Sequence, residues 1–516
     1  MALSTLERAI SLVCMILIVV FQLSRHVASN STEEAQALLK WKASLQNQNC
    51  SPLSSWTLSP VKATNNSTQP ENRKSPCSWS RISCNLAGRI NRFNMSISGL
   101  KGTLNELSFS SFPDLEYVDF GINELFGVIP TQIGNLSKLK YLDLSMNQFY
   151  GKIPVEITLL GELETLHLGD NQLNGSIPQE LGQLSSLNEL TLSGNHLDGS
   201  IPTCLSNLSY LGILYLFNNS LSGSIPPEMG NLSNLIELDV DTNSLTDFGI
   251  YPHLEYLDLS QNNFHGEISS NWAKCPKLGT LKIAANKISG SILVELGNLT
   301  KLSRLDLSSN LLAGEIPKEL ENLSLLEELI LNGNKLSGGI PLEIGSLSDI
   351  TRLDLSANKL TKSIPENLGN LLKIYSLNLS NNQFAQEIPP HLGKLSQLSE
   401  LDLSYNLLRG KIPSQICDLE VLQKLNLSHN NLSGFIPGGF QNMFALSSID
   451  ISYNELEGPI PNSTAFRNAS IEALQGNKDL CGDVVGLQPC NSSKAFESGK
   501  HGVSKVPREG KGTRKN

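Results

Sequence analysis

The chain has 516 residues, of which 40% are hydrophobic and 17% are charged, and its formal net charge is −10 at pH 7. That composition is typical of an ordered protein rather than a disordered one. The negative charge disfavours nucleic acid as a partner, and we expect none.

The first 29 residues have the features of a secretory signal peptide. Arg8 supplies a positive charge, residues 10–21 form an apolar core, and residues 27–29 are small enough for cleavage. An uncleaved anchor is the alternative, but this run is short for a bilayer span and no other run of spanning length follows. We therefore expect an extracellular chain, or a plasma-membrane location where a longer form carries a transmembrane helix.

Residues 30–88 are predicted to form an N-terminal capping domain. Ser31 and Glu34 match a capping box at the start of a helix over 31–45, in which apolar residues recur at helical spacing. Such a helix would cover the open first edge of a stack of repeats. Residues 59–76 are rich in Asn, Ser, Thr and Pro and are predicted to form a loop.

A repeat dominates residues 89–461. The stretch 302–317 reads L-x-x-L-x-L-x-x-N-x-L-x-G-x-I-P, and about sixteen copies occur at a period of about 24 residues. Leu305 and Leu307 share one face of a short strand, which parallel stacking on identical neighbours can bury. An ordinary parallel α/β protein is the alternative, but it does not need Asn at a fixed phase. The period therefore predicts an α/β leucine-rich-repeat solenoid. We expect a right-handed curved superhelix with a short parallel strand per repeat on the concave face and helical, 3-10 or extended segments on the convex face.

The Asn of each repeat is predicted to turn inward, where its amide offers two donors and an acceptor to backbone groups of neighbouring turns. Ser98 takes its place in the first, imperfect copy. The predicted Asn ladder consists of Asn123, Asn147, Asn171, Asn195, Asn219, Asn243, Asn262, Asn286, Asn310, Asn334, Asn358, Asn382, Asn406, Asn430 and Asn454.

One repeat departs from the period. The spacing from Asn243 to Asn262 is short by about five residues, and the segment between them lacks the G-x-I-P element. We expect the convex side to be pinched there. The same segment contains Asp247-Phe248-Gly249, which spells the kinase D-F-G. The phosphate loop, the strand Lys and the H-R-D loop of a kinase do not precede it. We therefore expect no enzyme activity and no cofactor.

Two close cysteine pairs lie at the two ends of the repeats. In a secreted chain they indicate disulfide caps, Cys77–Cys84 and Cys481–Cys490. Zinc is the alternative, but no His lies at zinc spacing, and we expect no metal. Residues 462–490 are predicted to form a C-terminal cap and residues 491–516 a disordered basic tail. Three cysteines within repeats are interpreted as buried free thiols: Cys204, Cys275 and Cys417.

The sequence has roughly eighteen N-x-S/T sequons, counting overlapping ones. Asn378 and Asn426 fall inside L-x-L and should face the concave side. A repeated N-L-S sequence produces such matches by chance, so glycosylation at each sequon is a separate prediction. Sequons on the outer side, where we expect glycosylation, include Asn135, Asn207, Asn231, Asn298 and Asn322.

A ligand-binding patch is predicted from the outward strand positions, which packing does not require. The slot inside L-x-L is usually Asp, so we interpret that Asp as scaffold. Several repeats break the rule, and their strands lie about 4.8 Å apart. Drift at unconstrained surface positions is the alternative. We expect these side chains to project into solvent and to suit an extended peptide. The exceptional slots are His167, Thr191, Tyr215, Lys282 and Ile330, and the candidate ligand-binding residues are His167, Asp170, Thr191, Tyr215, Phe217, Asp239, Asp241 and Lys282.

The cap C-x-W-x-x-x-x-C, the repeats LxGxIPxxIGxLxxLxxLdLsxN and the closing GNKDLCG resemble plant leucine-rich-repeat receptor-like kinases over about residues 31–500. The stretch Phe248–Ile283, with ASLQNQNC and NSSKAFESGKH, is most similar to the MDIS-interacting receptor-like kinase group. The resemblance implies an ectodomain that binds a peptide or protein ligand and recruits a co-receptor kinase, in signalling or defence. The transmembrane helix and kinase of that family do not follow in this sequence. The alternative function is a secreted inhibitor of cell-wall-degrading enzymes, like plant polygalacturonase inhibitors.

Overall fold

The computed structural model describes residues 32–47, 51–58, 75–247, 249–268, 272 and 274–490. The predicted signal peptide, most of the predicted loop over 59–76 and the predicted basic tail lie outside these ranges. The chain forms two compact units, residues Met1–Leu336 and Ser337–Asn516, and each is described separately. Among the described residues, no helix combines the length and the apolar character needed to cross a bilayer.

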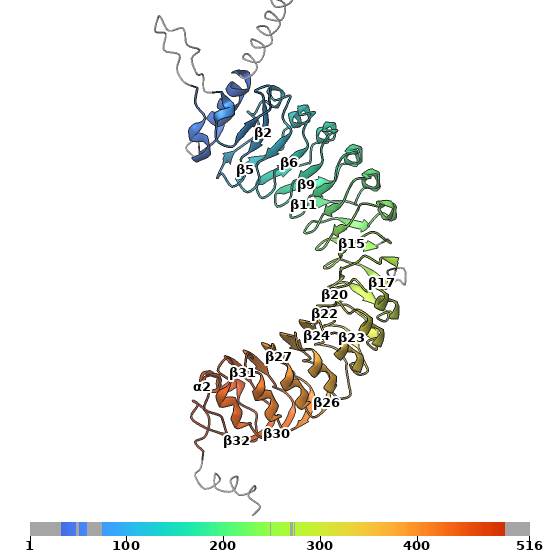
Figure 1. Cartoon of the computed structure of the whole chain (residues 1–516), viewed down its shortest axis with the longest axis vertical. Helices are drawn as coiled ribbons and strands as arrows, with labels where there is room; N and C mark the ends of the chain where they lie inside the picture. Colours follow the sequence, from blue (N-terminus) through green and yellow to red (C-terminus); the bar gives the residue numbers. More distant parts are fainter. Residues whose placement is uncertain are drawn as a thin grey trace, which may run out of the picture. The chain divides into compact units, whose positions relative to one another are not determined.

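A ladder of short inner strands runs through the first unit, each strand parallel to the next and in chain order (Figure 1). Each of these strands buries at least one apolar residue, as the Leu periodicity predicts. The antiparallel strand β1 (Ile82–Cys84) precedes the ladder and pairs with its first member. The ladder consists of β2 (Ile90–Asn94), β4 (Tyr117–Asp119), β6 (Tyr141–Asp143), β8 (Thr165–His167), β10 (Glu189–Thr191), β12 (Ile213–Tyr215), β14 (Glu237–Asp239), β16 (Tyr256–Asp258), β18 (Thr280–Lys282), β20 (Arg304–Asp306) and β22 (Glu328–Ile330).

Each repeat of the first unit continues into an outer strand of two to five residues and, in most repeats, a 3-10 segment. The outer strands are β3 (Lys101–Gly102), β5 (Glu124–Gly127), β7 (Gln148–Gly151), β9 (Gln172–Ser176), β11 (His196–Asp198), β13 (Ser222–Ser224), β15 (Ser244–Asp247), β17 (His265–Glu267), β19 (Lys287–Ser289), β21 (Ala313–Gly314) and β23 (Lys335–Leu336). The 3-10 segments are η1 (Ser51–Ser55), η2 (Pro76–Ser78), η3 (Phe109–Ser111), η4 (Thr131–Asn135), η5 (Val155–Leu159), η6 (Gln179–Gln183), η7 (Thr203–Asn207), η8 (Pro227–Asn231), η10 (Val294–Asn298) and η11 (Lys318–Asn322).

The second unit repeats this plan with its own parallel inner ladder. Its inner strands are β24 (Arg352–Asp354), β25 (Ser376–Asn378), β27 (Glu400–Asp402), β29 (Lys424–Asn426) and β31 (Ser448–Asp450). Its outer strands are β26 (Ala385–Gln386), β28 (Leu407–Gly410), β30 (Asn431–Phe435), β32 (Glu455–Pro459) and β33 (Asp479–Cys481). Its helical segments are η12 (Leu342–Ser346), η13 (Glu366–Asn370), η14 (Pro390–Lys394), η15 (Ser414–Asp418), η16 (Gly438–Asn442), α2 (Thr464–Asn468) and η17 (Ile471–Ala473). The strands and 3-10 segments confirm the predicted leucine-rich-repeat solenoid.

The Asn ladder makes the backbone hydrogen bonds that the sequence predicts. Asn171 donates to the carbonyl oxygens of Leu144, Leu168 and Gly169 at 3.0–3.2 Å, and its own oxygen accepts from Phe149 N at 2.9 Å. Each such amide ties its repeat to the preceding one. One further rung, Asn477 in the C-terminal cap, donates to Ile451 O and Leu474 O. The repeat consensus did not include that rung because Asn477 lies beyond the last copy.

Glycine allows successive 3-10 segments to approach closely. A Cβ added to Gly134, Gly182 or Gly297 would collide with a backbone carbonyl oxygen of the next repeat, from Glu156, Cys204 or Glu319. Any larger residue would separate the two backbones. The Gly of the I-G-x-L segment is therefore a packing requirement.

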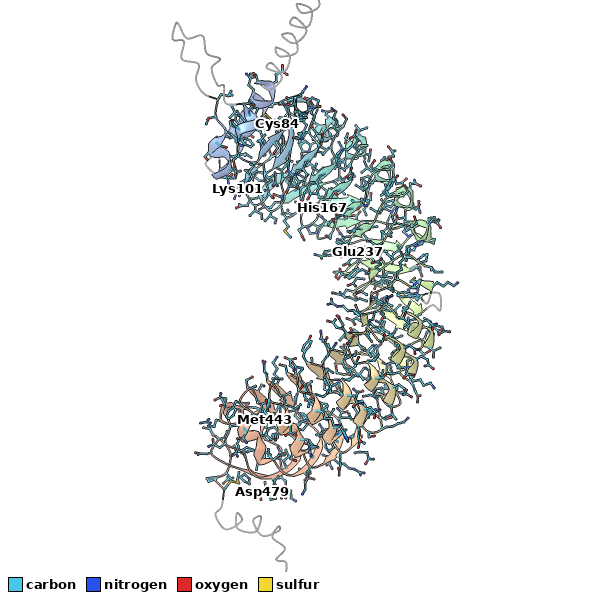
Figure 2. All side chains as sticks on the ribbon, in the orientation of Figure 1. Cys84, Lys101, His167, Glu237, Met443 and Asp479 are labelled. Carbon is cyan, nitrogen blue, oxygen red and sulfur yellow. A yellow bond between two sulfur atoms is a disulfide. The ribbon has the colours of Figure 1, made fainter. Side chains whose placement is uncertain are left out.

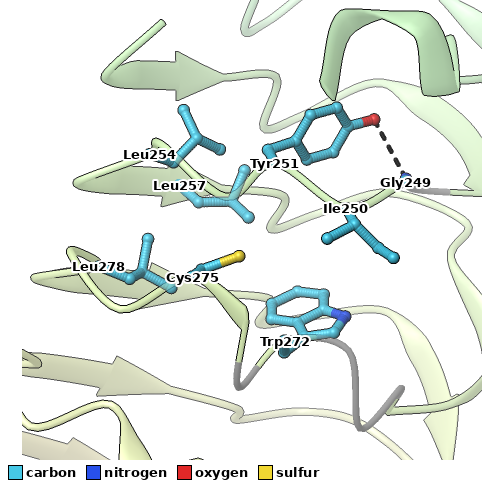
Figure 3. Close-up of a pocket in the computed structure, with 8 residues that line it drawn as sticks. All are labelled: Gly249, Ile250, Tyr251, Leu254, Leu257, Trp272, Cys275 and Leu278. Atoms are coloured by element: carbon cyan, nitrogen blue, oxygen red, sulfur yellow. Dashed lines mark hydrogen bonds between the residues drawn. The ribbon is translucent and has the colours of Figure 1, made fainter. Parts of the chain in front are cut away.

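The short repeat keeps its strand register and its rung. Leu238 still pairs with Leu257, and Asn262 donates to Val240 O at 2.9 Å. The missing residues come from the 3-10 side. There, Tyr251 accepts a hydrogen bond from Gly249 N at 3.1 Å, and a small apolar hollow remains (Figure 3). The hollow is lined by Gly249, Ile250, Tyr251, Leu254, Leu257, Trp272, Cys275 and Leu278.

The N-terminal cap is a helix over 32–44 with an aromatic cluster beneath it. Trp41, Trp56 and Trp79 are buried and their ring centroids lie 5.6–6.3 Å apart in sequence order. Glu34, expected to complete a capping box with Ser31, is instead fully buried and accepts from Ile90 N at 3.2 Å. Its side chain satisfies the first inner strand, because a buried edge donor needs a partner.

Both predicted disulfides are present. Cys77 is bonded to Cys84 in the N-terminal cap, and Cys481 is bonded to Cys490 in the C-terminal cap. The expectation of three buried free thiols holds only for Cys275. Cys204 and Cys417 are half-buried, because η7 and η15 lie at the surface of their repeats.

A candidate ligand-binding face

Many inner strands end in a residue that closes the following turn. Asp143 Oδ1 accepts from the backbone nitrogen of Ser145 at 2.8 Å and from its hydroxyl at 2.6 Å. This recurrent Asp belongs to the scaffold, because it satisfies a backbone donor. The same bonds occur at Asp306–Ser308, Asp354–Ser356, Asp402–Ser404 and Asp450–Ser452, and at Asn378–Ser380 and Asn426–Ser428 with an amide in place of the carboxylate.

Several repeats of the first unit lack both members of this Asp–Ser pair. The sequence holds His167 with Gly169, Tyr215 with Phe217, Lys282 with Ala284, and Ile330 with Asn332. Thr191 keeps only the serine, Ser193. Both positions change in these four repeats, whereas Thr191 keeps the serine alone and Asp239, followed by Asp241, keeps the aspartate alone. We use the name strand face for the outward residues of β8 to β18 together with those of the turns that directly follow these strands.

Strand pairing brings the predicted residues together. His167 lies beside Thr191, Thr191 beside Tyr215, and Tyr215 beside Asp239, while Lys282 follows across β16. Asp170, which is exposed, follows β8 in a left-handed backbone conformation. His167 and Glu237, which belong to two strands of this stretch, are labelled in Figure 2.

The predicted ligand-binding side chains were expected to project fully into solvent, but several of them are partly covered. His167, Thr191, Tyr215 and Phe217 are half-buried. The reason is lateral contact, because side chains on neighbouring strands are close enough to bond one another. Ile330 is only 7% exposed, as suits an aliphatic side chain with no polar group to hydrate.

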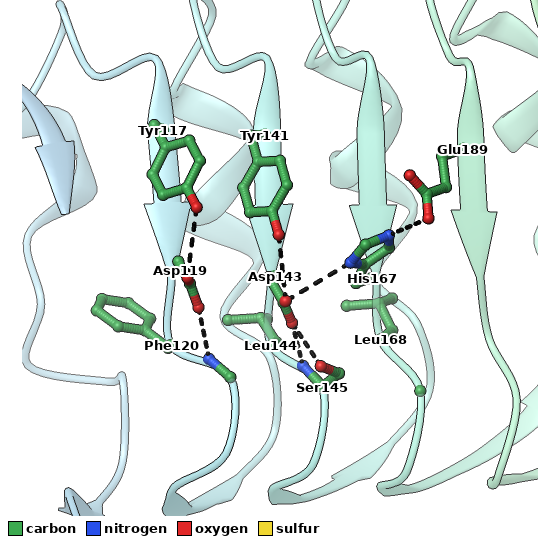
Figure 4. Close-up of polar contacts among 12 residues, drawn as sticks. Tyr117, Asp119, Phe120, Tyr141, Asp143, Leu144, Ser145, His167, Leu168 and Glu189 are labelled. Atoms are coloured by element: carbon green, nitrogen blue, oxygen red, sulfur yellow. Dashed lines mark hydrogen bonds and ion pairs between the residues drawn. The ribbon is translucent and has the colours of Figure 1, made fainter. Parts of the chain in front are cut away.

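His167 bridges two carboxylates on flanking strands (Figure 4). Its Nδ1 lies 3.5 Å from Asp143 Oδ2 and its Nε2 lies 2.9 Å from Glu189 Oε1. Burial alone would lower the pKa of His167, but the hydrogen bonds and charges of Asp143 and Glu189 outweigh burial and raise it. The imidazole is therefore held in its charged form more readily than a free histidine.

The strands before His167 form an internally satisfied aromatic ladder. The rings of Tyr117 and Tyr141 stack with centroids 4.3 Å apart, and the Arg92 guanidinium lies 3.5 Å from the Tyr117 centroid. Each tyrosine hydroxyl donates to the aspartate of its own strand, Asp119 or Asp143 (Figure 4). This part of the ladder offers few unsatisfied groups to a ligand.

The centre of the strand face is acidic. Oxygens of Asp239, Asp241 and Asp258 lie within 4.8 Å of one another. Burial and the charge of Asp258 raise the pKa of Asp239 to about 7. Lys282 Nζ lies 3.3 Å from Asp258 Oδ2, and the single Tyr256 hydroxyl lies 3.3 Å from Oδ2 of Asp239 and from Oδ2 of Asp258, either of which can accept its proton. These three carboxylates are the described residues that come close enough to share a metal ion, but Asp258 already has an ammonium partner.

Sequence reasoning missed four residues of the face: Glu189, Glu237, Tyr256 and Asp258. The first three occupy the other outward position of each strand, just before the buried central Leu. Reading both outward positions would have found them. Asp258 was interpreted as scaffold, and it does accept from Ser260 N, but it also holds Lys282.

The predicted glycosylation sites lie away from the strands. Asn135, Asn207, Asn231, Asn298 and Asn322 are each the last residue of a 3-10 segment, and each is exposed. A glycan at any of them would extend from the 3-10 side. Asp247 of the D-F-G text is exposed at the end of the outer strand β15.

Comparison with family models matches repeats over much of the chain. A leucine-rich repeat region matches residues 95–248, and leucine-rich repeat models match 253–275, 301–323, 325–347, 349–371, 373–432 and 396–456. A leucine-rich repeat N-terminal domain matches residues 31–85. The chain belongs to the leucine-rich-repeat proteins. None of these matched models is a kinase.

The curated relatives of this leucine-rich-repeat chain are plant receptor-like kinases. A probable leucine-rich repeat receptor-like protein kinase of Arabidopsis thaliana is 42% identical over 108 residues, which is 21% of this chain and 9% of the relative. MDIS1-interacting receptor like kinase 2 of the same plant is 38% identical over 125 residues, 24% of this chain and 11% of the relative. The alignments thus span about a tenth of the length of these relatives.

Solved structures similar to this leucine-rich-repeat chain include receptors and a receptor ectodomain. A TDR receptor is 32% identical with a TM-score of 0.58, over 73% of this chain and 74% of that one. A complex of PEPR1 with AtPEP1 is 27% identical with a TM-score of 0.52, over 83% of each. The ectodomain of GASSHO1/SCHENGEN3 from Arabidopsis thaliana, in complex with CASPARIAN STRIP INTEGRITY FACTOR 2, is 28% identical with a TM-score of 0.50, over 87% of this chain and 64% of that one.

Proposed function

We propose that this chain is an extracellular ligand-recognition domain of the plant receptor-like kinase type, binding a peptide or protein ligand in cell-surface signalling or defence. A co-receptor kinase is the second proposed partner. The similar ectodomains described above, two of them in complex with a named partner, support this function. The proposal includes secretion through residues 1–29, glycosylation on the 3-10 side, and a plasma-membrane location for any longer, membrane-anchored form.

One observation carries the ligand site. Both members of the Asp–Ser pair that closes turns elsewhere are replaced on β8, β12 and β18, where the outward residues are His167, Tyr215 and Lys282. We propose His167, Asp170, Thr191, Tyr215, Phe217, Asp239, Asp241 and Lys282 as ligand-contacting residues on this strand face.

The test uses the secreted chain as bait for the small-peptide fraction of plant extracellular fluid, with bound peptides identified by mass spectrometry. We expect discrete peptides to be retained by the native chain and lost from the Tyr215→Ala/Phe217→Ala variant. The matched control is Arg352→Ala/Ser448→Ala, which removes two exposed strand residues of the second unit. Peptide retention that is equal in both variants would place the site elsewhere, and capture of a wall-degrading hydrolase instead would favour the inhibitor function.

A further inference from the structure

Two aromatic rings lie in register with two carboxylates at the centre of the strand face. Tyr215 on β12 is the Cα partner of Asp239 on β14. The same pairing continues outward, because Asn218 N donates to Asp241 O at 3.0 Å, which places Phe217 beside Asp241. The Tyr215 and Phe217 ring centroids are 6.2 Å apart. Each ring therefore has a carboxylate as its lateral neighbour.

Charge on this part of the face is not balanced. His167 is engaged by Asp143 and Glu189, and Lys282 is engaged by Asp258. Within the described ranges, no cationic side chain forms an ion pair with Glu237, Asp239 or Asp241. The donors recorded for these three carboxylates are neutral: the hydroxyls of Tyr215, Tyr256 and Thr242, and the backbone nitrogen of Asp241. A cationic partner would therefore find three carboxylates that have neutral donors but form no ion pair among the described residues.

The carboxylates also repel one another. The pKa values of Asp239 and Asp241 are both raised, first by burial and then by the charge of Asp258. The ionisable groups around Asp239 are Tyr215, Glu237, Asp241, Tyr256, Asp258 and Lys282. Only Lys282 among them is a cation, and it lies against Asp258. A positive charge placed over Asp239 and Asp241 would relieve this repulsion.

We infer that the ligand presents an arginine side chain to β12 and β14, with its guanidinium over Asp239 and Asp241 and its stem along Tyr215 and Phe217. The inference rests on the proposed ligand-binding function. The guanidinium forms two parallel hydrogen bonds to carboxylates and the apolar stem of the side chain packs along the rings, so an arginine uses both features of the face. A metal ion would make no contact with the rings, and a lysine ammonium is a point charge that cannot form two parallel hydrogen bonds to a carboxylate.

The experiment selects phage-displayed random peptides on the native secreted chain, then resynthesises the winners with each Arg replaced by citrulline, a neutral analogue of nearly the same shape. We expect one arginine per peptide whose replacement weakens binding about tenfold or more, as for a charge-assisted hydrogen-bonded pair. The Asp239→Asn/Asp241→Asn variant should bind the arginine peptide as weakly as the citrulline one. The matched control is Glu328→Gln, which removes a carboxylate from β22, outside this part of the face.

The outcomes separate the inference from the function on which it rests. Peptides that are lost on Tyr215→Ala/Phe217→Ala but tolerate citrulline everywhere would overturn the arginine inference and leave the ligand site intact. Failure of any peptide to bind the strand face would overturn both. Stoichiometric Ca²⁺ binding that disappears in Asp239→Asn/Asp241→Asn and displaces the peptides would assign the carboxylates to a metal. Arginine-dependent binding that appears only after removal of residues 491–516 would identify that basic segment as the occupant instead.

Discussion

The amide of Asn310 donates a hydrogen bond of 2.8 Å to the carbonyl oxygen of Ile283, 27 residues earlier in the chain. Its oxygen accepts from Ile288 N at 3.0 Å, and the side chain is buried. One side chain thus satisfies backbone groups in two successive repeats. The stability of each repeat interface depends on such an amide as well as on leucine burial.

Replacing Asn310 by Ala is expected to destabilise the chain strongly. Each backbone group left buried without a partner costs about 1–3 kcal/mol. Denaturant unfolding measures the loss of unfolding free energy, and hydrogen exchange should show faster exchange at Ile288 N. The control is Asn332→Ala, which removes a half-buried Asn whose side chain makes no hydrogen bond to the described residues. Equal stability of the two variants would contradict the rung as a stabilising element.

The turn-closing Asp can be tested with a replacement that the chain itself supplies. Asp402→Ala should lower the free energy of unfolding by about 1–2 kcal/mol, because Ser404 N and its hydroxyl lose their acceptor. Asp402→Asn should change it little, since Asn378 and Asn426 accept the same bonds in other repeats. Denaturant unfolding distinguishes them. If the Asn variant were as unstable as the Ala variant, charge rather than turn closure would explain the recurrent Asp.

Close packing of the 3-10 segments makes two Gly→Ala substitutions differ sharply. Gly182→Ala would force its Cβ against the carbonyl oxygen of Cys204, and overpacking of this kind costs about 1–3 kcal/mol. Gly161→Ala meets no atom within 4 Å and should be neutral or slightly stabilising. Thermal and denaturant unfolding of the pair test this. A stable Gly182→Ala protein would show that successive repeats can separate freely.

Asp239 should make the folded state less stable as pH rises. Its pKa is about 7 in the folded chain against an ordinary value of 3.8, so between these values the folded state keeps a proton that the unfolded state releases. The contribution to stability is present below about pH 4 and is lost as pH rises through about 7. The free energy of unfolding, followed across that window, should fall more steeply for the native chain than for Asp239→Asn. Parallel slopes would show that the folded-state pKa is ordinary.

The elements that depend on spacing within a single repeat or cap could be predicted from the sequence. Leu305 and Leu307, the rung at Asn310 and the two cysteine pairs follow from local spacing, and the structure contains what they predict. Contacts across repeats were harder to predict. The bridge from His167 to Glu189 depends on both strand register and side-chain conformation, which a one-dimensional pattern does not contain. Glu34 likewise fits a helix cap by local spacing but bonds to a strand that lies 56 residues away.

In the short repeat, the number of residues between two strands changes while the distance between those strands does not. Residues are missing between Asn243 and Asn262, yet β14 and β16 keep their register and the rung keeps its bonds. Strand pairing sets the distance between neighbouring outward side chains, whatever number of residues connects the strands. Insertions and deletions on the 3-10 side therefore barely change the positions of side chains on the strand face. The number of residues in a repeat can change while the spacing of the outward side chains stays the same.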